Sequence, residues 1–228
     1  MKNCIVSFQD KDVVKELSGL GYNCIATIPS DKVSPQIATH ADVLYLKIDD
    51  KNILISSCQC ENIPILQGKG LCVNAIDSLK PGYQSECGLN VIKIQNTLIY
   101  NPKTAIKCDL FNNVTHKIPI KQGYTKCSTI VIDEKAYITE DKGVYNSMVK
   151  NGKDCLLLSK GSVRLDGYEY GFIGGAGIML ENRVLFFCGD VMQHPQKDNI
   201  LQFLNKYDVA FHYIKNKPMV DVGGAIIF

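Results

Sequence analysis

The sequence predicts an α/β fold in which five similar units close into a ring, and three observations support this prediction. Short apolar strands recur along the chain, most are followed by a second strand, and amphipathic helical segments separate them. Asp42, Asn90, Thr129, Gly177 and Ala225 occupy equivalent positions at the starts of such strands, at steps of 48, 39, 48 and 48 residues. A step of 45 residues across the chain ends completes the series. Self-similarity at this spacing indicates a repeated supersecondary unit.

Each unit is expected to contain a strand, a second strand, a helix and a third strand. Asp141 is a typical N-cap, Val144 and Met148 lie one helical turn apart, and Gly152 is a typical stop. Residues 40–56, 87–101, 126–140 and 175–188 are the expected hairpins. The expected helices cover residues 10–21, 140–152 and 195–208, and the strands that follow them cover residues 23–28, 154–159 and 209–214.

The two chain ends are expected to form one unit together. Residues 4–8 resemble a second strand, followed by a helix that Asp10 caps and Gly21 ends, but no first strand precedes them. The apolar run at 223–228 supplies the missing first strand, and this closure leaves no exposed sheet edge. No Pro- or Ser-rich linker divides the chain, so we expect one domain over residues 1–228.

The composition argues against several classes of protein. The 25 basic and 23 acidic residues give a net charge of +2 without a basic cluster, so we expect no nucleic-acid partner. No apolar run is long enough to span a membrane, and the first residues do not resemble a signal peptide. Several of the ten cysteines lie within apolar runs, so we expect a reduced, cytoplasmic protein without disulfides, bound metal or cofactor. The oligomeric state stays open.

The ring of five units, together with the segments "HADVLYLKID" (40–49) and "GFIGGAG" (171–177), resembles the pentein superfamily. This family has a five-bladed α/β propeller fold and includes arginine deiminase, agmatine deiminase, dimethylargininase and the amidinotransferases. It also includes a ribosome anti-association factor that is not an enzyme. The two segments are most similar to a bacterial branch of the superfamily. The resemblance covers the whole chain and implies a site at the central channel.

The resemblance implies that a His-x-Asp pair, further carboxylates and a cysteine nucleophile act on a guanidinium group. His40 and Asp42 match the His-x-Asp pattern, but residues 225–228 contain no cysteine where the enzymes carry theirs. Cys127 is the candidate replacement, because it begins the strand two units after His40. Its alternative role is that of a small structural residue. Asn90 and Thr129 are expected beside these three residues at one channel mouth.

Glycines are expected to line the other side of this mouth, where a ligand could approach the backbone closely. "GFIGGAG" is not a dinucleotide fingerprint, because it leads into a strand and not into a helix. His194 is expected in the loop before the last helix, as a solvated cap, and His116 and His212 are expected to be structural residues of outer strands. The expected ligand-binding residues are Asn90, Thr129, Gly174, Gly175, Asp221, Gly223 and Gly224.

Three functions follow from the sequence as alternatives. The first is a hydrolase or amidinotransferase-like enzyme that acts on a guanidine- or amidine-like molecule through His40, Asp42 and Cys127. The second is a catalytically silent protein that binds a small, cationic molecule in the channel. The third is an interaction protein, which the nearly balanced charge disfavours. The missing C-terminal cysteine favours a catalytically silent protein, whereas the polar residues of the expected channel favour an enzyme.

Overall fold

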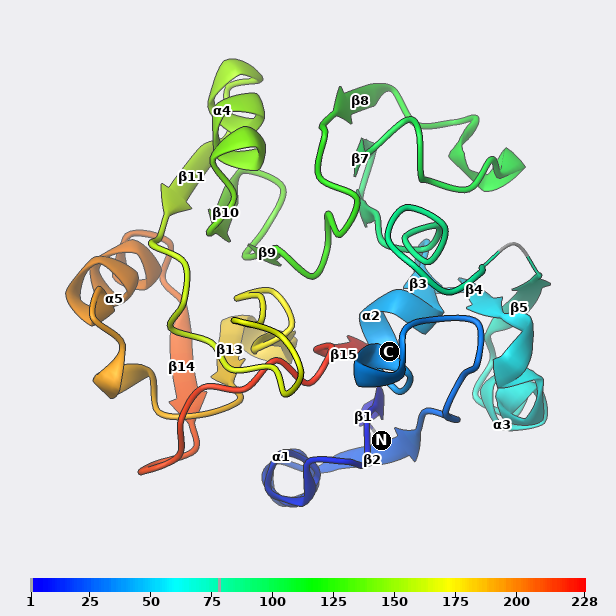
Figure 1. Ribbon diagram of the computed structural model, residues 1–228, viewed down its shortest axis with the longest axis horizontal. Coiled ribbons are helices and arrows are strands. Elements are labelled where there is room, and N and C mark those ends of the chain that lie inside the picture. Colours follow the sequence, from blue (N-terminus) through cyan, green and yellow to red (C-terminus); the bar gives the residue numbers. More distant parts are fainter. Residues whose placement is uncertain (1, 78) are drawn as a thin grey trace.

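A computed structural model describes residues 2–77 and 79–228, and it places five three-stranded sheets around a common centre (Figure 1). In each sheet the first strand pairs antiparallel with the second, which pairs in parallel with the third. The sheets are β15–β1–β2, β3–β4–β5, β6–β7–β8, β9–β10–β11 and β12–β13–β14. This arrangement is the ring of five units that the sequence predicts.

The strands are short, and the first strand of each unit lies toward the centre of the ring (Figure 1). Their bounds are β1 Lys2–Val6, β2 Tyr22–Ala26, β3 Tyr45–Lys47, β4 Asn52–Ser56, β5 Cys72–Ile76, β6 Ile92–Ile94, β7 Thr97–Tyr100, β8 His116–Pro119, β9 Thr129–Val131, β10 Ala136–Thr139, β11 Asp154–Leu157, β12 Gly177–Leu180, β13 Val184–Phe187, β14 Ala210–Tyr213 and β15 Ala225–Ile227.

Helices α1 (Lys11–Gly19) and α4 (Lys142–Lys150) begin where the sequence places their caps. The Asp10 carboxylate accepts hydrogen bonds from two backbone N–H groups of the first turn of α1, and Asp141 accepts one from Val144 in α4. None of the helices in the described ranges is long and apolar enough to span a membrane. The α-helices are α1 Lys11–Gly19, α2 Ala41–Leu44, α3 Ile63–Gly68, α4 Lys142–Lys150 and α5 Lys197–Lys206.

The third unit departs from the predicted plan. Its connection between β7 and β8 contains the short 3₁₀ helix Asp109–Phe111 in place of an α-helix. This unit is also the one that spans only 39 residues between Asn90 and Thr129. The connection between β7 and β8 spans 15 residues, as many as the β4–β5 connection that contains α3, so the short step arises instead in the nine residues 120–128 between β8 and β9.

The starts of the second and third units also differ from the prediction. Asp42 lies in the one-turn helix α2, because the N–H groups of Val43 and Leu44 both bond to the carbonyl of His40. Strand β3 begins only at Tyr45, and β6 begins at Ile92, two residues after Asn90. In the other three units the strands begin at Thr129, Gly177 and Ala225, as predicted.

The two ends of the chain close the ring, as predicted. Strand β15 pairs antiparallel with β1, and Ile226 lies opposite Ile5. Asn3 and Phe228 extend the pair through two reciprocal backbone hydrogen bonds of 3.0 Å. Ile226 is almost fully buried and belongs to the same apolar cluster as Ile5. Closure therefore rests on both strand pairing and apolar burial.

We expect the substitution Ile226→Ala to lower the free energy of unfolding by about 2–5 kcal/mol, because it leaves a cavity beside the closing strands. Ile65→Ala is the matched control, since Ile65 is 47% exposed and should change stability by about 0.5 kcal/mol or less. Urea denaturation, monitored by circular dichroism, measures the free energy of unfolding of both variants. Equal effects of the two variants would contradict a stabilising role for the closure.

Candidate active site

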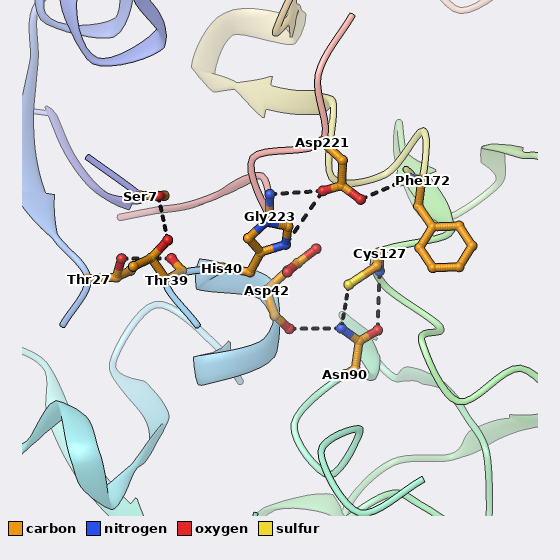
Figure 2. Close-up of polar contacts among 10 residues, drawn as sticks. All are labelled: Ser7, Thr27, Thr39, His40, Asp42, Asn90, Cys127, Phe172, Asp221 and Gly223. Atoms are coloured by element: carbon orange, nitrogen blue, oxygen red, sulfur yellow. Dashed lines mark hydrogen bonds and ion pairs between the residues drawn. The ribbon is translucent and has the colours of Figure 1, made fainter. Parts of the chain in front are cut away.

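Five buried polar side chains form a cluster in the interior of the protein (Figure 2). The five residues come from segments that precede the inner strands of four units. They are His40, Asp42, Asn90, Cys127 and Asp221, which are between 1% and 4% exposed. The sequence predicted all five as site residues, and the fold brings them together although they span residues 40 to 221.

Hydroxyl groups fix the backbone that carries His40. Ser7 and Thr39 share a hydrogen bond of 2.8 Å between their hydroxyls, and the Thr27 hydroxyl donates to the Thr39 carbonyl at 2.7 Å. His40 Nδ1 then lies 3.6 Å from Asp221 Oδ1 (Figure 2). Burial lowers the pKa of His40, and the Asp42 carboxylate opposes this shift. The imidazole is therefore biased toward its neutral form.

Asp221 links three segments through one carboxylate. Its Oδ1 accepts from the N–H of Gly223 at 3.0 Å, and its Oδ2 accepts from the N–H of Phe172 at 2.9 Å. Burial raises the pKa of Asp221 to about 6, although both hydrogen bonds favour the ionised form. A Cβ atom at Gly175 would lie 1.8 Å from Asp221 Oδ1, so this carboxylate requires glycine there.

Asn90 holds Cys127 in place. Its Oδ1 accepts from the N–H groups of Lys126 and Cys127 at 2.7 and 3.2 Å, and its Nδ2 donates to Cys127 Sγ at 2.8 Å. Burial raises the pKa of the Cys127 thiol well above its usual value, and the carboxyl groups of Asp42 and Asp221 add to this effect. The ligand-free thiol is therefore protonated at neutral pH.

The Asp42 carboxylate points between His40 and Cys127 (Figure 2). Its backbone N–H donates to the Gly223 carbonyl at 3.0 Å, but neither carboxylate oxygen has a hydrogen-bond partner among the described residues. Burial raises the pKa of Asp42, and His40 counteracts this shift. An unpartnered buried carboxylate is costly, so Asp42 is suited to a ligand or a proton.

A cavity of about 280 Å³ opens onto one side of the cluster. His40, Cys127 and Asp221 contribute the polar atoms deep in it, and none of its described lining residues is Lys or Arg. Its rim carries the exposed Glu169 carboxylate. We call it the aromatic cavity, because its walls are formed by Tyr124, Tyr168, Tyr170 and Phe172 together with Ile37 and Leu165.

A second cavity of about 400 Å³ lies on the other side of Asp42, which is shared between the cluster and this space. Thr129, Gly174 and Gly224 line this second cavity and not the aromatic one, so the prediction of a single mouth for all site residues is wrong. Gly223, with a φ of +75°, is packed against His40, and a Cβ there would lie 2.4 Å from His40 Cβ. It therefore supports the cluster.

The comparisons with known proteins identify the family. A family described only as a family of unknown function, DUF6873, matches residues 5–226. The chain belongs to this family. No curated protein matches its sequence significantly.

Solved structures show the fold of this DUF6873 protein. Agmatine deiminase from C. jejuni is similar with a TM-score of 0.58 at 9% identity, over 93% of this chain and 86% of that one. A cysteine-to-serine mutant of DDAH from Pseudomonas aeruginosa, complexed with citrulline, has a TM-score of 0.58 at 6% identity, over 99% of this chain and 98% of that one. The DUF6873 chain therefore has the pentein fold, as the sequence resemblance predicted.

Sequence reasoning missed two buried carboxylates near the site. Glu140 follows β10, and its Oε2 accepts from the N–H of Ile173 at 2.9 Å, whereas its Oε1 has no partner among the described residues. Glu86 accepts from the N–H of Ser34 at 2.7 Å and from the Tyr124 hydroxyl, so it orients one wall of the aromatic cavity. An acidic residue directly after an apolar strand was the available signal for Glu140.

The remaining histidines lie where the sequence placed them, with one difference. His116 is in β8 and His212 is in β14, which are outer strands. His194 precedes α5 but is only 5% exposed, so its prediction as a solvated cap is wrong. Its Nδ1 instead accepts from the N–H of Gln196 at 3.0 Å. All ten cysteines are free thiols, and no group of His, Cys, Asp or Glu in the described ranges is arranged to hold a metal ion.

We expect Glu140 to make stability depend on pH. Burial raises the pKa of its carboxyl from 4.5 to about 7. The folded state thus holds a proton that the unfolded state releases, and stability falls as pH rises from about 4.5 to 7, by up to about 3 kcal/mol. Glu140→Gln removes this ionisation, so the variant should gain stability relative to the native chain with rising pH.

Chemical denaturation of both proteins at pH 5 and pH 8 measures this difference. Glu61→Gln is the control, because Glu61 is exposed and makes no hydrogen bond or ion pair with any described residue. A difference between native chain and Glu140→Gln that stays the same at both pH values would show that Glu140 does not titrate in this range.

Proposed function

We propose that this protein binds a small guanidinium- or amidinium-bearing molecule in the aromatic cavity and that Cys127 attacks its central carbon. The observation that carries the proposal is a cavity whose deep polar groups are a thiol, an imidazole and a carboxylate. Asp221 offers an anionic acceptor for a planar cation, and aromatic faces attract cations. The absence of Lys and Arg among the described lining residues also favours a positively charged ligand.

The chemistry would follow from these groups. The Cys127 thiol gives its proton to the neutral His40, and a bond forms between Sγ and the guanidinium carbon as the C=N electron pair moves onto nitrogen. The amine then leaves with the proton from His40. Water adds to the carbon of the remaining S-alkylthiouronium, the C–S bond breaks, and a ureido product, the free thiol and a proton, which the released amine takes up, result; an amidine would give an amide by the same steps. The reaction class is therefore hydrolysis of a guanidine or amidine.

A bound cation would also activate the thiol. In the free protein, burial and two carboxyl groups hold the pKa of Cys127 high. A guanidinium beside Sγ adds a positive charge and favours the thiolate, as the Asn90 amide already does through its hydrogen bond. Asp42, behind the thiol, would stabilise the imidazolium form of His40. Cys127 would thus be reactive mainly when the ligand is present.

A catalytically silent protein that binds the same cation is the second candidate. The observation that favours it is the raised pKa of Cys127, which has acidic neighbours where an activated thiol has basic ones. This candidate needs the aromatic cavity and Asp221 but no bond to sulfur. The two candidates therefore share a ligand and differ in the fate of the thiol.

Labelling with two isosteric reagents separates these possibilities. 2-Chloroacetamidine is cationic and 2-chloroacetamide is neutral, and both alkylate a thiol with loss of chloride. A hydrogen bond to a charged group contributes about 1.5–3 kcal/mol, so we expect the cationic reagent to modify Cys127 about tenfold faster or more. The exposed Cys60 in the same protein gives the intrinsic ratio of the two reagents. Peptide mass spectrometry measures both rates.

Asp221→Asn should abolish the preference for the cationic reagent at Cys127 and leave Cys60 unchanged. Equal rates for the two reagents at Cys127 would refute cation recognition in the aromatic cavity. If Cys127 stays unmodified while benzamidine raises the melting temperature, the silent candidate holds. Turnover of guanidino compounds to ureido products, absent in Cys127→Ser, would establish the enzyme.

A further inference from the structure

The second cavity is built as a regular funnel around the axis of the ring. The third residue of every inner strand lies at its wall, and each of the five side chains is half-buried. Strands β3, β9 and β15 surround the centre of the ring in Figure 1, where this funnel lies. These five residues, which we call the collar, are Lys47, Ile94, Val131, Met179 and Ile227.

The collar is apolar on four of its five sides. Lys47 is the exception, and its ammonium is held 3.1 Å from the Asp50 carboxylate. The first residues of three of the same strands, Thr129, Gly177 and Ala225, also line the funnel. A ligand in this funnel would therefore contact aliphatic side chains at the level of the collar, whereas Asp49, Asp50, Lys93 and Gln95 also line the cavity.

The floor of the funnel is polar and has unused hydrogen-bonding groups. Both Asp42 carboxylate oxygens and the Thr129 hydroxyl lack partners among the described residues, although Asp42 and Thr129 are only 2% and 3% exposed. The Lys126 ammonium also lines the funnel and makes no hydrogen bond to any residue in the described ranges. Buried polar groups are normally paired, so the unpaired Asp42 carboxylate and Thr129 hydroxyl on one floor indicate a missing partner, and the half-buried Lys126 ammonium lies beside them.

The charges of the floor select the kind of partner. Asp42 and Lys126 bear opposite formal charges that interact, so their sum is zero. A charged head group would pair with the residue of opposite charge. The other residue would then lie beside a like charge or remain unpaired, which is unfavourable in a buried site. A primary carboxamide offers N–H donors for the carboxylate and a carbonyl oxygen that accepts from the ammonium and the hydroxyl.

We propose that this funnel is a second ligand site, which takes a neutral molecule with an aliphatic body and a primary carboxamide head. The aliphatic body lies within the collar, and the carboxamide bonds to Asp42, Lys126 and Thr129. This site opens on the other side of Asp42 from the aromatic cavity and shares no other lining residue with the polar cluster. It does not depend on a reaction at Cys127.

Ligand-observed NMR titration with hexanamide tests the site, with hexanoate and hexylammonium as probes of equal length. A ligand of eight heavy atoms reaches a Kd of roughly 1–10 mM in a matched site. We expect hexanamide to bind within this range and each charged probe to bind about tenfold more weakly. Equal binding of all three, or tightest binding of either charged probe, would overturn the carboxamide assignment.

Matched variants locate the binding. Thr129→Val removes the floor hydroxyl and should weaken hexanamide binding about fivefold, the effect of one hydrogen bond. Thr97→Val is the control, since the Thr97 hydroxyl is also buried and unpartnered but lies outside the funnel. Equal effects of the two threonine variants would contradict the proposal.

Val131→Arg places a large side chain in the collar and should abolish binding of hexanamide. Its folding is checked by the melting temperature and by chloroacetamidine labelling of Cys127, which should match the native chain. Hexanamide binding that persists in Val131→Arg would exclude the funnel as its site. Because the labelling reports only on the aromatic cavity, failure of the funnel proposal and failure of the proposed function are distinguishable.

Discussion

The rest of the site depends on the contacts of one buried group, the Asp221 carboxylate. It accepts hydrogen bonds from the backbone of the turn before β15 and from the loop before β12, and it lies beside His40 from the second unit. A buried carboxylate is tolerated only when such bonds compensate for lost hydration. The requirement for glycine at position 175 and the fixed position of Phe172 in the cavity wall both follow from this one group.

The regular spacing of the inner strands made the fold predictable. Capping by Asp10 and Asp141, the glycines after the helices and the apolar C-terminal strand are local signals, and the structure confirms each. The absence of an α-helix from the third unit was not predicted. The only signal for it is that residues 101–115 have no apolar periodicity. The shortened step from Asn90 to Thr129 reflects the nine-residue connection between β8 and β9 and not the missing helix.

The side of the ring that each residue faces was harder to predict. Alternation along a strand places residues two apart on one face, but this rule applied neither to Asp42 nor to Asn90, which precede their strands. Thr129 begins a strand and faces the funnel, whereas Cys127, two residues earlier, faces the aromatic cavity from a turn. The tyrosines of the cavity wall come from two segments with no periodic pattern, between β8 and β9 and between β11 and β12, so only tertiary packing brings them to the site.

The pairing of β15 with β1 has a mechanical consequence. The strands are antiparallel, and Asn3 and Phe228 are bonded to each other at one end of the pair. A pulling force applied to the two ends of the chain would therefore load these hydrogen bonds one after another, as in a zipper, and not all together. The first event under tension would be the peeling of β15, which would draw the neighbouring turn, with Asp221, away from His40 before any other sheet opened.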